Sequence, residues 1–309
     1  MRIKLYPLVL SIFLFPILFS SCHLLVEDEF PDFKKVPVLN GFLQADSTFR
    51  VQVTFTANLT DSVPAPVVNA VVIIETTTNN PDTLVYTEKG CYASPKVVKA
   101  GESYTCIVNI PGFPQMTAQT TVPEPTEIDS VVFTDLAGRG EEGEKISSVD
   151  FVTSNDINKN IFWQVQLISE GFKTDYDFEN NKWIEYYGIE NETIYMLAGQ
   201  DTVLLNEANP LTLFSNKLIK KNSYNVKFYF SENNTRLYSD QIPYVVLRTV
   251  DESYYKYLKQ YYIYESAGYT AIGKTPQKYP LYSNVKNGLG VFAGFSTTRK
   301  EIPLTPKGE

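Results

Sequence analysis

Histidine is almost absent from this sequence: its 309 residues include one, His23. Catalytic arrangements of the Ser-His-Asp and Cys-His kinds need an imidazole that titrates near neutral pH. Common zinc sites combine histidine with cysteine. We therefore expect a protein that is not an enzyme of these kinds and that holds no metal ion and no cofactor.

Basic residues are fewer than acidic ones, with 27 Lys and Arg against 35 Asp and Glu, so the formal charge is −8. An acidic surface repels phosphate backbones, and we expect no nucleic acid as a partner. The acids leave one catalytic alternative open, because glycosidases need only two carboxylates at a set separation. No pair of acids is marked for this role by its sequence context.

One short segment, "NDINKN", resembles a calcium-binding loop through Asp156, Asn158 and Asn160. Ile161 stands where such a loop needs its glycine, and Leu167 stands where it needs its closing glutamate. We therefore expect a polar turn between two strands at this place.

Long apolar segments are missing apart from one run, Leu5–Phe19, which follows the basic residues Arg2 and Lys4. The run is shorter than the roughly 20 apolar residues of a membrane-spanning helix, and its flanks are those of a secretory signal. Small residues then precede Cys22. We expect a lipoprotein signal peptide at residues 1–21 and acylation of Cys22 (palmitate and related chains), which would anchor the mature protein to a membrane. An ordinary signal peptide beside an incidental cysteine is the alternative.

Residues 22–35 are rich in acids, including Glu27, Asp28, Glu29 and Asp32. We expect a solvated acidic tether between the lipid and the folded part. A sorting signal is the alternative, since some bacteria mark surface-exposed lipoproteins by acids close to the acylated cysteine.

With Cys22 assigned to lipid, only Cys91 and Cys106 remain. Two leftover cysteines in an oxidising compartment often pair. They flank a stretch that reads as a hairpin, so a cross-strand disulfide is one expectation and two separate buried thiols are the alternative.

The folded part carries mostly β signals. The segment "TFRVQVTFTANL" alternates apolar and polar residues, and further short strands follow at intervals marked by turns. This pattern predicts an immunoglobulin-like β-sandwich over residues 36–126. Tyr104 lies two residues before Cys106, as in the tyrosine corner of such domains.

A second β-rich, sandwich-like domain is predicted over residues 127–309, after a seam stiffened by Pro123 and Pro125. One helix is expected at about residues 251–266, because aromatic residues recur there at helical spacing, Asp251 or Ser253 can cap its start and Gly268 can end it. The helical stripe consists of Tyr254, Tyr257, Leu258, Tyr261 and Tyr262. We expect this stripe to pack the helix on a sheet.

The glycine-rich segment "YSNVKNGLGVFAGF" at Tyr282–Phe295 raises the question of a nucleotide-binding loop. Such a loop needs a helix after it, and the residues that follow have the composition of a strand. Asn287-Gly288 instead predicts a hairpin turn, and the other glycines allow strands to cross closely.

Several of these segments, in this order, resemble one family of lipoproteins from Bacteroidota. They are "VPVLNGFLQAD", "PVVNAVVIIE", "GCYAS" with "GESYTCIVNI", "EIDSVVF", "NDINKNIFWQVQL", "YYKYLKQY" and "YSNVKNGLGVFAGFS". The family is catalogued as a domain of unknown function (number 4249). The resemblance implies an outer-membrane lipoprotein encoded beside a TonB-dependent receptor. We expect the protein to be exposed at the surface rather than to face the periplasm. It carries over no catalytic residues.

The resemblance also implies a modification, because exported proteins of that bacterial group are often O-glycosylated at Asp-Ser/Thr-apolar triplets. A polar turn entering a strand explains each triplet equally well. The candidate acceptors in this chain are Ser47, Ser62, Thr83, Ser130 and Thr202.

Together these observations favour a non-enzymatic accessory lipoprotein that docks on a TonB-dependent importer. The alternative is a surface module that captures a glycan or a peptide. In that case Trp183, Tyr186 and Tyr187, which lie in the polar segment "NNKWIEYYG", would stack on the ligand, although packing in a core or a hairpin also explains these aromatic residues.

Overall fold

The computed structural model describes residues 34–58, 61, 63–77, 80–192, 201–207, 212–231, 241–268 and 281–304. Residues Lys35–Glu309 form one compact unit. The predicted signal peptide, the Cys22 anchor and nearly all of the acidic tether lie outside the described residues, as does Ser62.

Most of the described chain is β-structure, which confirms the prediction of a mostly β protein. The strands are β1 (Pro37–Gln44), β2 (Thr48–Phe55), β3 (Val71–Thr76), β4 (Asp82–Tyr86), β5 (Cys91–Val97), β6 (Ser103–Asn109), β7 (Met116–Thr121), β8 (Ile128–Arg139), β9 (Lys145–Ser154), β10 (Phe162–Asp177), β11 (Lys182–Glu192), β12 (Leu213–Ser215), β13 (Ser223–Ser231), β14 (Gln241–Val250) and β15 (Leu289–Glu301). The helices are α2 (Thr202–Glu207), α3 (Glu252–Gly268) and a short 3₁₀ helix, η2 (Asn216–Leu218). Neither α2 nor α3 is both long enough and apolar enough to cross a membrane.

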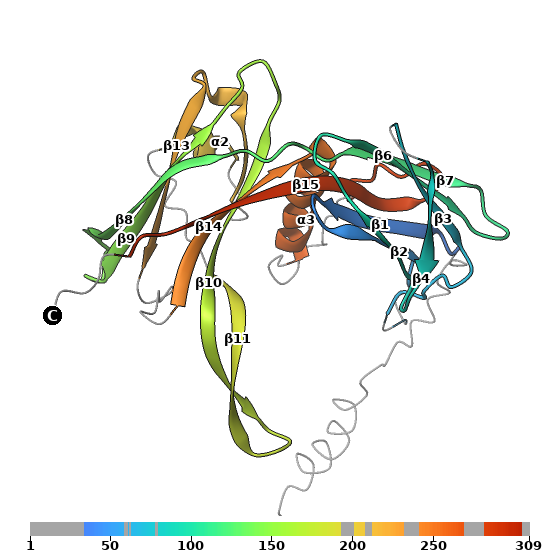
Figure 1. Ribbon diagram of the computed structural model, residues 1–309, viewed down its shortest axis with the longest axis horizontal. Coiled ribbons are helices and arrows are strands. Elements are labelled where there is room, and N and C mark those ends of the chain that lie inside the picture. The colour runs from blue at the N-terminus through green and yellow to red at the C-terminus, as the bar shows by residue number, and fades with distance from the viewer. Residues whose placement is uncertain are drawn as a thin grey trace, which may run out of the picture. The chain divides into compact units, whose positions relative to one another are not determined.

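The strands form one large mixed sheet and one small sheet (Figure 1). The large sheet has the order β11-β10-β14-β15-β1-β2-β5-β4-β3-β6-β7, with β12 paired to β10 off this path, and the small sheet has the order β13-β9-β8. Strand β15 is central, because it pairs in parallel with β1 and antiparallel with β14. The division into domains at residues 36–126 and 127–309 stays a prediction. Strand β15 pairs with a strand from each range, β1 from the first and β14 from the second.

Alternation along the strands determines the first hydrophobic core. In β2, Phe49, Val51 and Val53 are buried, whereas Arg50 points outward. Val285 and Phe292 from the C-terminal part of the chain pack into the same core. Tyr104 is buried beside them, and its hydroxyl accepts a hydrogen bond of 2.7 Å from the backbone N–H of Lys99. That bond to a backbone group a few residues upstream is the contact that a tyrosine corner makes.

A second core lies between β10, β14 and the small sheet, around the fully buried Trp163. The indole Nε1 donates a 2.9 Å hydrogen bond to Thr126 Oγ1, and Thr249 Oγ1 lies 2.9 Å from the same oxygen. A buried indole N–H needs such a partner, because leaving it unpaired costs about 1–3 kcal/mol. Thr126, in the seam after Pro125, is thereby held against β14.

Helix α3 spans Glu252–Gly268, which confirms the predicted helix and its end. Asp251 is its N-cap: Oδ1 accepts a 2.8 Å hydrogen bond from the N–H of Tyr254, as the spacing predicts. The predicted stripe packs on the sheet through Tyr254, Tyr257 and Leu258, whereas Tyr261 is 40% exposed.

The glycine-rich segment leads into β15, so no helix follows it and the nucleotide-loop interpretation has no support here. The predicted hairpin at Asn287-Gly288 is wrong. Lys286 makes an isolated bridge with Thr117 of β7, and β15 then pairs with β1 and β14. The predicted close crossing is present: a Cβ placed on Gly294 would lie 2.8 Å from Val122 Cγ2. Glycine is needed here because another chain segment crosses the strand.

Candidate functional site

Strands β10 and β11 form a long hairpin at one edge of the large sheet (Figure 1). Strand β10 pairs with β14 only as far as Gly171, whereas its pairing with β11 continues to Asp177. Among the described strands, the outer parts of β10 and β11 therefore pair only with each other. Among the described strands, none pairs with the outer edge of β11. An open edge of this kind offers backbone N–H and C=O groups to another chain.

One face of this hairpin carries a row of aromatic residues, of which Tyr176 is half-buried and the other four are exposed. We name this row the aromatic ladder: Phe172, Tyr176, Phe178, Trp183 and Tyr187. Phe172 is directly opposite Tyr187, and Tyr176 is opposite Trp183, so the four side chains share a face. The ring centroids of these two pairs lie 5.4 Å and 5.2 Å apart, in edge-to-face geometry. Phe178, in the turn, extends the row at 5.1 Å from Tyr176.

The ladder is turned toward solvent. Trp183 is 71% exposed, Phe178 87% and Tyr187 56%. Single exposed apolar residues are common, whereas a contiguous row of large rings on a surface marks an interaction site. The rings contact one another along the hairpin, but four of the five remain more than half exposed, so folding alone does not account for them.

The tip of the hairpin is well ordered by hydrogen bonds. Asp177 Oδ1 accepts from the backbone N–H groups of Glu179 and Asn180 at 3.0 Å and 3.1 Å, and Asn180 Nδ2 donates to Asp177 Oδ2 at 2.7 Å. The side-chain and backbone bonds from Asn180 lower the pKa of Asp177. Tyr176 and Asn181 also hydrogen-bond through their side chains. A fixed turn holds the ladder in one shape, which reduces the entropy lost on binding.

Of the three predicted stacking residues, the structure brings two together. Trp183 and Tyr187 belong to the ladder, whereas Tyr186 lies on the opposite face of β11 beside the register position of Lys173. Packing in a hydrophobic core does not explain any of the three, because all are exposed. Packing within the hairpin is present for Trp183 and Tyr187, whose rings contact Tyr176 and Phe172. Phe172 and Tyr176 were missed by sequence reasoning, and only the register between β10 and β11 reveals them as partners.

A second feature is a pocket of about 350 Å³ beside α3, lined mainly by aromatic rings. Helix α3 contributes Tyr254, Tyr257, Leu258 and Tyr261 to its wall. Phe42 of β1, Arg248 of β14 and Phe295 of β15 complete the lining. Sequence reasoning found the helical part of this wall as a packing stripe, but it missed the three strand residues.

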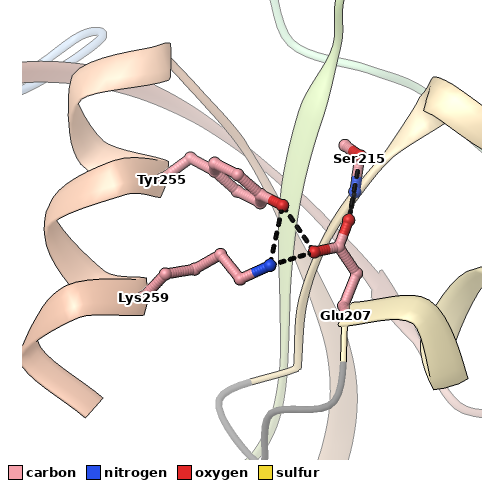
Figure 2. Close-up of polar contacts among 4 residues, drawn as sticks. All are labelled: Glu207, Ser215, Tyr255 and Lys259. Carbon is pink, nitrogen blue, oxygen red and sulfur yellow. Dashed lines mark hydrogen bonds and ion pairs between the residues drawn. The ribbon is translucent and has the colours of Figure 1, made fainter. Parts of the chain in front are cut away.

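A third feature is a polar cluster between α2, β12 and α3 (Figure 2). The carboxylate of Glu207 accepts bonds of 2.5 Å from both Lys259 Nζ and Tyr255 Oη on one oxygen. Its other oxygen accepts bonds from the N–H and the hydroxyl of Ser215, at 3.0 Å and 2.9 Å. The Glu207 side chain is only 5% exposed.

The electrostatics of this cluster argue for a structural role. Burial alone would raise the pKa of Glu207, but the hydrogen bonds from Lys259, Tyr255 and Ser215 outweigh burial and lower it. Burial would lower the pKa of Lys259, but its bonds to Glu207 and Tyr255 raise it. The pKa values of the acid and the base thus move away from neutrality, whereas a general acid or base works best near the operating pH. The cluster joins the two helices.

The pKa of Asp251, unlike that of Glu207, shifts toward neutrality. Burial raises the pKa of its carboxyl to about 6, against the hydrogen bonds from Thr120, Tyr254 and Gly294. Asp251 also lines an open pocket of about 550 Å³ with Glu75 and Glu252. The Asp251 carboxylate accepts hydrogen bonds from Tyr254 in the first turn of α3 and from Thr120 of β7, so its role is structural. Among the described residues, no group of three or more His, Cys, Asp or Glu is arranged to hold a metal ion.

The calcium-like segment is a polar turn, as expected. The N–H of Asn158 donates to Asp156 Oδ1 at 3.0 Å, and Lys159 Nζ lies 3.4 Å from Asp156 Oδ2. The backbone bond from Asn158 and the contacts with Lys159 lower the pKa of Asp156.

The two cysteines are free thiols, and both are buried. The hairpin expected between them is wrong, since Cys91 lies on β5, which pairs with β2 and β4, whereas Cys106 lies on β6, which pairs with β3 and β7. The structure thus holds two separate thiols, the alternative to the disulfide. Burial raises the pKa of Cys106 to about 12. Arg50 Nη2 lies 3.6 Å from Cys91 Sγ.

Four of the five predicted O-glycosylation acceptors fall in the described residues. Thr83 on β4, Ser130 on β8 and Thr202 at the start of α2 are exposed, and Ser47 is half-buried in a tight turn. Asp201 before Thr202 caps a helix rather than entering a strand, since its Oδ1 accepts bonds of 2.8 Å and 3.1 Å from the first turn of α2. Modification of these residues stays a prediction.

Comparison with known proteins supports the resemblance drawn from the motifs. No curated protein matches this chain. A family model described as "Domain of unknown function (DUF4249)" matches residues 25–301, which is most of the chain and includes the hairpin and α3. The chain therefore belongs to the DUF4249 family.

Proposed function

We propose that the protein is a non-enzymatic, surface-exposed lipoprotein of the outer membrane that docks on a TonB-dependent importer. The single observation that carries the docking role is the aromatic ladder on the outer part of the β10–β11 hairpin. The anchor at Cys22 and the importer partner rest on the sequence signals and on the family resemblance. The immunoglobulin-like arrangement of residues 36–126 and the sandwich-like arrangement of residues 127–309 belong to the same proposal, supported by the Tyr104 contact.

Two properties of the hairpin favour a protein as its partner. Tryptophan and tyrosine dominate the binding energy of protein interfaces, and Trp183 and Tyr187 are both more than half exposed. The outer edge of β11 also offers backbone groups to a further strand. A strand of the partner that paired there would place its side chains beside Trp183 and Tyr187.

A second candidate is the capture of a glycan, which the 71% exposure of Trp183 favours. An exposed indole can stack on a sugar ring, and Glu185, between Trp183 and Tyr187 on the same face, supplies a hydrogen-bond acceptor. This candidate uses the same ladder and does not need the open strand edge.

Co-purification tests the docking role. The full chain is tagged at its C-terminus and extracted from envelopes in gentle detergent. The proposal predicts that a TonB-dependent barrel is recovered with the wild type and with Tyr264→Ala, and is lost with the double variant Trp183→Ala, Tyr187→Ala. Tyr264 is a matched control because it is an exposed aromatic residue on α3, outside the ladder. Equal recovery with all three would contradict docking through the ladder.

A glycan array with the same three proteins separates the two candidates. Binding of a glycan by the wild type and by Tyr264→Ala that the double variant abolishes, without recovery of a barrel, would replace docking by glycan capture. Labelling with palmitate tests the anchor separately: the wild type should be labelled and Cys22→Ala should not. A Cys22→Ala variant that still sedimented with envelopes would contradict the anchor.

A further inference from the structure

The pocket beside α3 has a guanidinium in a wall of aromatic rings. Arg248 reaches it from β14, and its Cζ lies 5.1 Å from the centroid of the Phe295 ring. The Arg248 Nη1 atom makes two long contacts, at 3.3 Å to Tyr254 Oη and 3.5 Å to Gln164 Oε1. Both partners are neutral, so neither compensates the positive charge.

No acid of the described residues forms an ion pair with Arg248, and its Nε is buried without a hydrogen-bond partner. A half-buried guanidinium usually finds a carboxylate, because leaving polar groups unpaired away from water costs free energy. Within the described part of the chain, the guanidinium donates hydrogen bonds only from Nη1, so its Nη2 atom can donate to a ligand.

The aromatic residues that line the rest of the pocket favour a ligand with a flat, apolar ring. Phe42 contacts Tyr254 at 5.4 Å and Tyr257 at 5.9 Å between ring centroids, and Tyr254 lies 5.6 Å from Phe295. Tyr257 and Tyr261 are stacked at 6.1 Å. These rings brace one another, so the pocket keeps its shape without a ligand.

The mouth of the pocket is open to solvent, since Phe42 is 39% and Tyr261 40% exposed. At about 350 Å³ the pocket lies at the small end of the range for ligand sites, which matches a single ring with a short substituent.

We propose that this pocket binds a small aromatic monocarboxylate. The carboxylate accepts hydrogen bonds from the terminal nitrogens of Arg248 and compensates the positive charge of the guanidinium. The ring of the ligand packs among Tyr257, Tyr261 and Phe42, where edge and stacked contacts with other rings are favourable. The C-terminal residue of a peptide and a free aromatic acid share this chemistry.

Calorimetric titration of the full chain tests the proposal with three probes. N-acetyl-phenylalanine represents a peptide C-terminus, phenylacetate represents a free acid, and N-acetyl-phenylalaninamide is the neutral match of the first. We expect at least one of the two acids to bind. If N-acetyl-phenylalanine binds, its amide should bind at least tenfold more weakly. The acid that binds more tightly shows whether the natural ligand is a peptide C-terminus or a free aromatic acid. Absence of binding by both acids, or equal binding of the amide and its acid, would overturn the proposal.

Two variants then locate the binding. Arg248→Gln removes the charge, and Tyr261→Ala removes a ring at the open mouth and is the safer variant for folding. Each should weaken the acid at least fivefold, whereas Trp183→Ala should leave binding unchanged, because the pocket is independent of the docking hairpin. A melting curve checks that each variant is folded. Unchanged affinity in folded Arg248→Gln would place the ligand elsewhere and overturn the proposal. If Arg248→Gln does not fold, unchanged affinity in Tyr261→Ala would do the same.

Discussion

Thr120 Oγ1 donates a 2.6 Å hydrogen bond to Asp251 Oδ2, across 131 residues of sequence. The bond ties β7 to the cap of α3. The N–H of Asp251 also donates to the carbonyl of Gly294 at 2.9 Å, so the start of the helix is held to β15 as well. One residue therefore secures the start of the helix, and other residues of this helix line the aromatic pocket.

The first prediction concerns Asp251 and pH. Burial raises the pKa of its carboxyl from 3.8 to about 6, so between these values the folded state binds more protons than the unfolded state. This term makes the free energy of unfolding fall as pH rises through that window, by about 3 kcal/mol for a shift of about two units. Asp251→Asn removes this pH-dependent contribution, because an amide side chain does not titrate in this range. The variant should gain stability relative to the wild type between pH 4 and pH 7 in urea unfolding, and a difference independent of pH would contradict this.

The second prediction concerns Glu207, whose pKa is lowered in the folded state. A lowered pKa contributes stability above the unfolded value, and this stability is lost as pH falls through the folded value. Glu207→Gln leaves Lys259 without its counter-ion and should lower the free energy of unfolding at pH 7 by about 3 kcal/mol. The matched control is Glu252→Gln, which breaks the exposed pair with Lys256 and should cost about 0.3–0.5 kcal/mol. Similar losses in the two variants would show that the buried cluster is not a structural tie.

The third prediction concerns the crossing over β15. A Cβ at Gly294 would lie 2.8 Å from Val122 Cγ2 and 2.9 Å from Val122 Cα, and the backbone atom cannot rotate away. Gly294→Ala should therefore destabilise the protein by about 1–3 kcal/mol in thermal or urea unfolding. Gly138→Ala is the control, since nothing lies within 4 Å of a Cβ at that position. Equal stability of the two variants would mean that the strands do not cross as described.

The fourth prediction concerns the two free thiols. Protein purified without reductant, unfolded and treated with an alkylating reagent should take up label at both Cys91 and Cys106. In the folded protein Cys106 should react very slowly, because it is fully buried and its pKa is raised to about 12, which leaves almost no thiolate. Mass spectrometry that found the two residues joined would contradict the strand order of β5 and β6.

Periodicity allowed the sequence to predict much of the fold. The alternation in β2 and the helical spacing of Tyr254, Tyr257 and Leu258 each identified a face that the structure buries. These are local patterns, and they appear within one segment. The parallel pairing of β15 with β1 joins segments about 250 residues apart, and no local pattern encodes which strands meet.

The same limit applies to the candidate sites. Trp183 and Tyr187 were visible as exposed candidates because polar residues surround them in the sequence. Phe172 became their neighbour only through the register of the hairpin. Arg248 carried no sequence signal at all, since its lack of a carboxylate partner is a property of the packed structure.

The docking role is tested most directly by photo-cross-linking from position 183 in living cells. A photoreactive phenylalanine analogue replaces Trp183, and in a second strain it replaces Tyr264 as the control. The proposal predicts a cross-linked product from position 183 that contains a TonB-dependent barrel, and no such product from position 264. Position 183 yielding no protein adduct, or yielding the same products as position 264, would contradict docking through the aromatic ladder.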